Sequence, residues 1–178
     1  MTRRDEIIQV AGDLLERQGP EGLTMRAIAG ELGIKAPSLY KHVADKRELE
    51  IALIADGFAQ LAEVFEKAVA DGSDPVAGIA GAYRVWALDH PHLYRLMTDQ
   101  PLPRDELPPG AEQRALVPLL DAVGGDRDRA RAMWAFAHGL VTLEIADRFP
   151  PDADIAAAWR VGLEGIASSV TRLEGETS

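Results

Sequence analysis

Apolar residues recur at helical spacing along almost the whole chain, and this pattern limits the folds that the chain can adopt. One face of the first expected helix carries Ile7, Ile8, Ala11, Leu14 and Leu15. No run of alternating β-branched residues, which would indicate a half-buried strand, interrupts the pattern. Hydrophobic residues make up 47% of the 178 residues, enough for a substantial core. We therefore predict an all-α fold.

Capping residues and glycines divide the beginning of the chain into three short helices. Residues 2–5 form a capping-box pattern that starts the first helix, and Gln18-Gly19-Pro20 stops it. Thr24 caps a second helix, which Gly33 ends by allowing a left-handed turn. The third helix follows this turn and ends near residues 42–44.

Longer helices are expected in the rest of the chain. A second capping-box pattern, Asp45-Lys46-Arg47-Glu48, starts a long helix that breaks at residues 71–75. Further helices are predicted at about 75 to 89, 91 to 98, 111 to 123, 126 to 147 and 152 to 174. A proline-rich loop of low order, residues 100–110, connects the second and third of these.

Basic residues are concentrated in one part of an otherwise acidic chain. The net charge is −10, yet residues 24–47 carry five basic and two acidic groups, a local balance of +3. Residues 51–178 carry eleven basic and twenty acidic groups, a balance of −9. This distribution predicts a small cationic contact face on an acidic body, and chance clustering is the alternative.

The start of the third helix suits close contact with DNA. Two short helices joined by a tight glycine turn can form a helix-turn-helix, in which the second helix enters the major groove. Pro37 loses no hydrogen bond there, because the first N–H groups of a helix lack partners. The small residues Ala36 and Ser38 allow the helix end to approach the bases closely.

The remainder of this helix separates an inward face from an outward face. Leu39 and Val43, four residues apart, are expected to face the core. The outward side chains are Tyr40, Lys41 and His42. They would reach backbone phosphates, although a packed surface tyrosine and a simple helix-end cation are the structural alternatives.

These residues occur in a longer pattern that resembles the DNA-binding region of TetR-type (tetracycline-repressor family) transcriptional regulators. The matching segments, within residues 5–55, are Leu23-Thr24-Met25-Arg26, Ile28-Ala29, Leu32-Gly33-Ile34, Pro37-Ser38-Leu39-Tyr40, His42-Val43 and Lys46-Arg47-Glu48-Leu49. The resemblance implies a helix-turn-helix DNA-binding domain at residues 1–47 and a helical ligand-binding and dimerisation domain at residues 48–178. It implies a homodimeric repressor, without a cofactor, that releases palindromic double-stranded operator DNA when it binds a small organic effector.

The resemblance also assigns roles to individual residues. The implied DNA-binding residues are Thr24, Arg26, Ala36, Pro37, Ser38, Tyr40, His42 and Lys46, and the basic residues Lys35 and Lys41 complete the set of candidates. Lys35 stands where the family often has serine, so the cap of the third helix is expected to be weak. Ala36 offers a base only apolar contact, such as with a thymine methyl group, and the operator sequence therefore stays open.

Aromatic residues and histidines share helical faces in the second half of the chain. The five candidates for the lining of an apolar effector pocket are Tyr83, Trp86, His90, Trp134 and His138. The first three recur on one helix and the last two on another, while plain core packing is the alternative. Residues 133–139 and 89–97 resemble a C-terminal subtype of the family that has a Trp followed by His-Gly.

Two other classes of function are kept open. His90 and His92, with Asp89 and Asp147, would suit a small helical metal-dependent enzyme, but no third ligand follows at helical spacing. The other alternative is a helix-turn-helix regulator that works as a DNA-bound dimer without an effector. Metal analysis of the purified protein would test the first of these.

The last two helices are the candidates for a dimer interface. Residues 132–143 contain no Asp, Glu, Lys or Arg. The final helix carries an apolar stripe made of Ile155, Trp159, Gly162, Leu163, Ile166 and Val170. Pairing both helices with their symmetry mates would form a self-complementary four-helix interface, and packing within one subunit is the alternative.

The compartment is inferred from what the sequence lacks. There is no cysteine, and no apolar signal-like segment stands at the N-terminus. The longest stretch without charged residues, residues 132–143, is too short to span a bilayer. We therefore expect a soluble cytoplasmic protein that does not enter a membrane.

Overall fold

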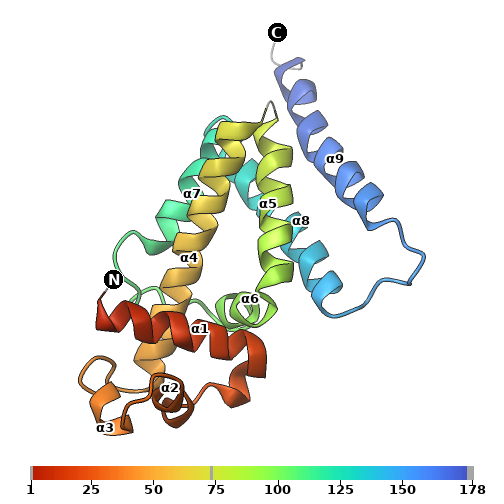
Figure 1. Cartoon of the computed structure of the whole chain (residues 1–178). Helices are drawn as coiled ribbons and strands as arrows, with labels where there is room; N and C mark the ends of the chain where they lie inside the picture. The colour runs from red at the N-terminus through yellow and green to blue at the C-terminus, as the bar shows by residue number, and fades with distance from the viewer. Residues whose placement is uncertain (1, 73, 176–178) are drawn as a thin grey trace. The chain divides into compact units, whose positions relative to one another are not determined.

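The protein is all-α throughout the part of the chain that the structure describes. The computed structural model describes residues 2–72 and 74–175, with side chains except at 71 and 167–175. Within this range there is no strand, and the helices are α1 (Arg3–Gly22), α2 (Met25–Glu31), α3 (Ala36–Leu39), α4 (Lys46–Asp71), α5 (Pro75–Asp89), α6 (Pro91–Thr98), α7 (Ala111–Ala122), α8 (Arg127–Ile145) and α9 (Ile155–Gly175) (Figure 1). The fold-class prediction is confirmed. No helix in the described ranges has both the length and the apolar character needed to cross a bilayer.

The helices belong to two compact units. The first contains residues 1–60 and 90–114, and the second contains residues 61–89 and 115–178. Helix α4 contributes residues to both units. The predicted boundary at residue 47 separates the residues that bind DNA from those that bind the effector. Packing into compact units does not test this division, so the boundary stays a prediction.

The first unit is built around α1. Helix α1 packs against α2 and α6, and α2 packs against α3 (Figure 1). Thr2 and Asp5 form the predicted capping box, with the Thr2 amide donating to Asp5 at 2.7 Å and the Asp5 amide donating to Thr2 at 3.2 Å. Gly19 interrupts the helix with φ 70°, and a further turn continues to Gly22. Gln18-Gly19-Pro20, where the sequence predicts the end of the first helix, is therefore a kink in α1 that is followed by one more turn.

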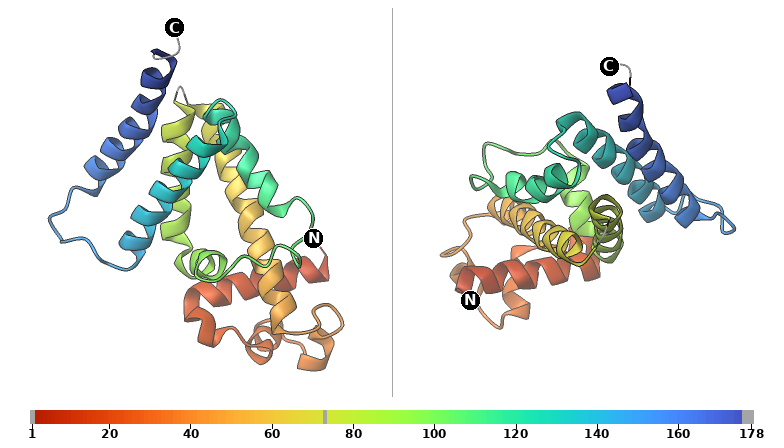
Figure 2. Two further views of the ribbon diagram at one scale, coloured as in Figure 1. Left: turned by 180° about the vertical axis from the view of Figure 1, so that it is seen from behind. Right: turned by 90° about the horizontal axis from the view of Figure 1, so that it is seen from above.

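The second unit holds α8 between two other helices. Helix α8 packs against α5 and against α9, and Figure 2 shows α9 at the edge of this unit. Buried residues include Tyr83 and Trp86 on α5 and Met133 and Val141 on α8. Trp159 of α9 is also buried, with its ring 5.6 Å from that of Phe136 in an edge-to-face arrangement. Aromatic residues from α5 and α9 therefore contribute to this core.

Candidate nucleic-acid interface

The turn between α2 and α3 has the geometry that a helix-turn-helix requires. Gly33 has φ 63°, a left-handed conformation that costs glycine little. The Ile34 amide donates to the Ala29 carbonyl at 2.9 Å, and the Gly33 amide donates to the Gly30 carbonyl at 3.1 Å. These two bonds make a Schellman motif, which ends α2 and redirects the chain into α3.

The starts of the two helices are capped differently. The Thr24 hydroxyl accepts a hydrogen bond from the Ala27 amide at 3.1 Å, as predicted for the cap of α2. Lys35, the N-cap of α3, makes no side-chain cap bond. The first N–H groups of α3 therefore have no side-chain partner from Lys35.

Helix α3 is shorter than expected, but its two faces are those predicted. It covers four residues, and the segment from Tyr40 to His42 continues as turns, with the His42 and Val43 amides both donating to the Leu39 carbonyl. Leu39 and Val43 are buried, whereas the Tyr40 side chain is 51% exposed. The inward and outward faces of the segment therefore follow the sequence prediction.

The ten residues assigned to DNA binding lie on the surface of the first unit. Nine of them are exposed and Ala36 is half-buried. Lys46, at the start of α4, lies 3.4 Å from the Pro20 carbonyl oxygen and 3.9 Å from Glu50. The Glu48 amide donates to Asp45 at 2.8 Å, and the Glu48 carboxylate accepts from the Ala44 amide at 2.7 Å, so the start of α4 is capped. The ten assignments stay predictions.

The five residues assigned to an effector pocket have different surroundings. Tyr83 and Trp86 are buried on α5, and the Tyr83 ring lies 6.3 Å from that of Phe65. The Trp134 side chain is 52% exposed and stacks on His138 with 5.8 Å between ring centroids. These four belong to the second unit, whereas His90 belongs to the first.

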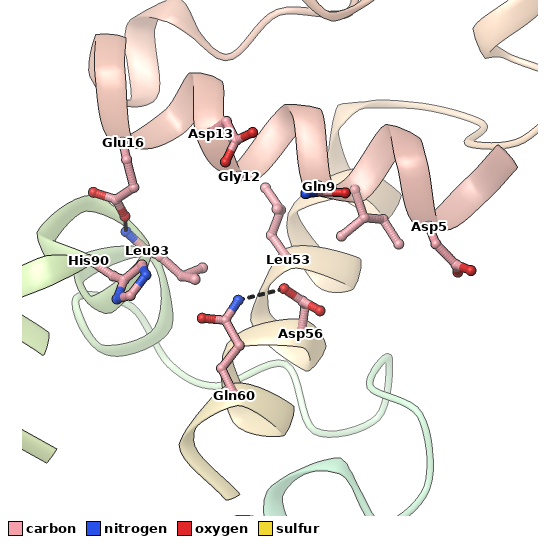
Figure 3. Close-up of a pocket in the computed structure, with 11 residues that line it drawn as sticks. Asp5, Gln9, Gly12, Asp13, Glu16, Leu53, Asp56, Gln60, His90 and Leu93 are labelled. Carbon is pink, nitrogen blue, oxygen red and sulfur yellow. Dashed lines mark hydrogen bonds between the residues drawn. The ribbon is translucent and has the colours of Figure 1, made fainter. Parts of the chain in front are cut away.

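His90 lines a cavity of about 490 Å³ in the first unit (Figure 3). Four carboxylates face this cavity: Asp5, Asp13, Glu16 and Asp56. Three of them have structural partners, because Asp5 belongs to the capping box, Asp56 accepts from Gln60 at 2.7 Å, and Glu16 accepts from the Leu93 amide at 2.7 Å. Glu16 thereby provides the cap of α6 that His90, its N-cap residue, does not provide.

The described residues contain no ligand cluster that would support the metal-enzyme alternative. In the described ranges, no group of three or more His, Asp or Glu residues could hold a metal ion. The His92 ring packs beside Gly19, so that a Cβ on this glycine would lie 3.4 Å from His92 Cε1. His92 thus packs where α1 kinks.

A polar cluster inside the second unit was not identified from the sequence. Glu144 on α8 accepts a bidentate ion pair from Arg84 on α5, with a shortest distance of 2.7 Å. Its carboxylate also accepts the Trp159 indole N–H at 2.8 Å, and the Arg84 guanidinium lies 5.9 Å from the centre of the Trp159 ring. The Glu144 side chain is 6% exposed. One carboxylate thus joins α5, α8 and α9.

Part of the apolar stripe of α9 packs within the subunit. A Cβ added to Gly162 would overlap the Phe136 ring, so this glycine allows α9 to approach α8 closely. Trp159 packs on the same ring. The side chain of Val170 lies outside the described residues. Val161, beside the stripe, is 65% exposed.

Comparisons with known proteins cover both halves of the chain. Residues 7–53 match the family described as "Bacterial regulatory proteins, tetR family", and residues 76–166 match "Tetracyclin repressor-like, C-terminal domain". An uncharacterized HTH-type transcriptional regulator of Mycobacterium tuberculosis is 34% identical over 154 residues, which cover 80% of this chain and 70% of that protein. The chain spans 58% of the length of three further mycobacterial regulators.

Solved structures share the fold over nearly the full length. A protein of unknown function from Rhodococcus sp. RHA1 has a TM-score of 0.74 and 27% identity, covering 93% of this chain and 95% of that one. A TetR variant from Acinetobacter baumannii AYE, solved in complex with minocycline, has a TM-score of 0.67 and 25% identity, covering 97% and 98%. The sequence matches to both regions show that the chain belongs to the TetR family of DNA-binding transcriptional regulators.

Proposed function

We propose that this DNA-binding regulator is a repressor that binds a palindromic operator as a homodimer and releases it when an organic effector binds. The observation that carries the proposal is the exposed start of α3. Pro37 and Ser38 are exposed and Ala36 is half-buried there, directly after the left-handed Gly33 turn. A helix end of this kind can enter the major groove and meet base edges.

The residues around α3 are proposed to divide between base and phosphate contacts. Ala36, Pro37 and Ser38 would lie at the bases and thereby determine sequence preference. The phosphate contacts would come from the other exposed polar residues, namely Thr24, Arg26, Lys35, Tyr40, Lys41, His42 and Lys46. These contacts would position the helix and make affinity strongly salt-dependent.

The dimer is proposed to form through α8 and α9. The charge-free stretch of α8, residues 132–143, has exposed residues that include Ala135, Gly139 and Leu143. A Cβ on Gly139 would meet nothing within 4 Å, so another helix has room to approach. The occupant is a second copy of the chain, because a two-fold axis brings the same face of both subunits together. The recognition helices of the two subunits would then meet half-sites about 34–36 Å apart.

The effector is proposed to be apolar or amphipathic, because three of the candidate contacts in the second unit carry aromatic rings. These candidates are Tyr83, Trp86, Trp134 and His138. Helix α4 is continuous between the start that carries Lys46 and the second unit, so displacement of α4 would change the separation of the recognition helices. A coupling of about 1–3 kcal/mol would weaken operator binding roughly 5- to 150-fold.

The proposal is tested first by selection of bound fragments from the host genome. We expect palindromic sites, bound with an affinity that falls steeply as the salt concentration rises. Recovery of fragments without a shared palindrome would overturn the operator assignment. Changes at Ala36 or Ser38 are expected to shift the selected sequence, whereas changes at Lys46 are expected to weaken all sequences alike.

The effector is tested with the recovered operator. Organic compounds are screened for quenching of tryptophan fluorescence and for release of labelled operator. Trp134→Ala should impair the response to an active compound more than it impairs operator binding. Equal loss of both, with a lower melting temperature, would show that Trp134 supports folding and not an effector site. If no compound releases the operator, the effector-independent regulator is favoured.

A further inference from the structure

An ion pair connects the start of α4 with the loop between α6 and α7. Arg47 is the second residue of α4, and Glu106 lies in the loop of residues 99–110, both within the first unit. The guanidinium binds the carboxylate with two donors, Nη2 to Oε1 at 2.6 Å and Nε to Oε2 at 3.2 Å. This bidentate geometry is also the one in which arginine binds a phosphate group.

The loop holds Glu106 in place by its own hydrogen bonds. The Glu106 and Leu107 amides donate to the Pro103 carbonyl at 2.9 and 3.2 Å, which forms a turn. Arg104 pairs with Glu112 through two bonds of 2.9 and 3.0 Å and so connects the loop to the start of α7. The carboxylate of Glu106 is therefore presented to Arg47 by an ordered segment.

Arg47 is adjacent in sequence to one of the basic residues assigned to phosphate. It directly follows Lys46 in the first turn of α4. The side-chain hydrogen bonds between the two groups raise the pKa of Arg47 and lower the pKa of Glu106, and both groups are charged near neutral pH with or without the pair. The side chains are 54% and 49% exposed, and exposed ion pairs contribute little stability. A DNA phosphate can therefore replace the carboxylate.

We propose that Arg47 is a further phosphate-binding residue and that Glu106 occupies it in the DNA-free protein as an internal competitor. On binding, the guanidinium exchanges the two carboxylate oxygens for the two non-bridging oxygens of a phosphate, with the same bidentate geometry. The loop carboxylate thereby lowers the affinity for every DNA sequence, because each contact made by Arg47 must first break the pair. This inference rests on the proposed function, since it takes the start of α4 as part of the DNA-binding surface.

The experiment measures binding of a fluorescent mixed-sequence duplex of about three helical turns by anisotropy over a range of salt concentrations. The full-length protein is compared with Glu106→Gln, Asp105→Asn, Arg47→Gln and the Arg47→Gln/Glu106→Gln double variant. Asp105 is the matched control, because it is an exposed carboxylate in the same loop. Melting temperatures establish that each variant is folded.

Glu106→Gln is expected to tighten binding about two- to fivefold, the range of an exposed ion pair, and Asp105→Asn less than about 1.5-fold. In the Glu106→Gln background, Arg47→Gln should remove this gain and reduce the slope of log affinity against log salt by about 0.9. A gain that equals that of Asp105→Asn, or that persists without Arg47, would overturn the inference. If the unaltered protein does not bind the duplex at low salt, the proposed function itself fails.

Discussion

The helix-turn-helix and the α5–α8–α9 region both carry conspicuous side chains, but their surroundings differ. Around α3, Tyr40 points outward and Leu39 inward, as the helical spacing predicts. In the second unit, Trp86 is 4% exposed while Trp134 is 52% exposed, although both were assigned to one pocket. The orientation of the α3 side chains depends on a local turn, whereas burial in a helical bundle depends on which distant helix covers each face.

The largest effect is expected from a charge on the exposed face of α8. Leu143→Glu is expected to yield a monomer, because a dimer would have to bury an unpaired carboxylate. Operator affinity should fall by about 100-fold or more, since two linked recognition helices bind far better than one. Light scattering and anisotropy with the operator measure the two effects.

Leu116→Glu provides the matched control for that change. Leu116 on α7 is 40% exposed and Leu143 is 41% exposed, so both variants place a carboxylate at an equally accessible position. The control should remain dimeric with unchanged affinity. A dimeric Leu143→Glu protein would locate the interface elsewhere. Gly162→Glu is unsuitable for this purpose, because a side chain there overlaps Phe136 of the same subunit.

A second prediction concerns the contribution of the Arg84–Glu144 ion pair to stability. Glu144→Gln should lower the free energy of unfolding by about 2–3 kcal/mol, because it leaves Arg84 without its anionic partner. This value is below that of a fully buried pair because the Arg84 side chain is 32% exposed. Urea unfolding measures the loss.

The control for Glu144 is an exposed ion pair on the same helix. Asp128 and Arg131 pair at 2.6 Å with side chains that are 89% and 72% exposed. Asp128→Asn should change the stability by less than about 0.5 kcal/mol. Similar losses in both variants would show that Glu144 does not hold α5, α8 and α9 together.

Local signals in the sequence predict much of the first unit. The capping box at Thr2, the cap at Thr24 and the left-handed Gly33 each involve neighbours within a few residues, and all are confirmed. The helices of the second unit also lie close to their predicted bounds, because hydrophobic periodicity and proline breaks are local too. Fold class and element order were therefore predictable.

Contacts between distant residues were not predictable in this way. Arg47 and Glu106 are 59 residues apart, and Arg84 and Glu144 are 60 apart, so no spacing rule connects them. The loop at residues 100–110 was expected to have low order, but its Pro103 turn presents Glu106 to Arg47. Arg47 belongs to the basic cluster of residues 24–47, but the sequence gives it no DNA contact, because its partner Glu106 is far away in the chain.

A third prediction tests the phosphate assignment at the start of α4. Lys46→Ala should weaken binding to all sequences by about three- to tenfold and reduce the salt slope by about 0.9, because one phosphate contact is lost. Lys67→Ala is the control, since Lys67 is an exposed lysine on the same helix but belongs to the second unit. Equal effects of the two changes would show that Lys46 acts only through the net charge of the protein and not through a phosphate contact.

The smallest expected effect concerns Thr24, which has one structural role and one proposed contact role. Its hydroxyl oxygen accepts from the Ala27 amide, and its proton is available to a phosphate oxygen. Thr24→Ala should lose about 1 kcal/mol of stability together with some DNA affinity, because it removes both functions.

Thr24→Asp separates the two roles of this residue. A carboxylate caps the helix and favours its positive end, so stability should match that of the unaltered protein within about 0.5 kcal/mol. The same carboxylate repels phosphate, so affinity for DNA should fall below that of Thr24→Ala. Thermal unfolding and anisotropy, measured on the same samples, report the two quantities. If Thr24→Asp binds DNA as well as Thr24→Ser, which retains the hydroxyl, Thr24 caps α2 without touching the DNA backbone.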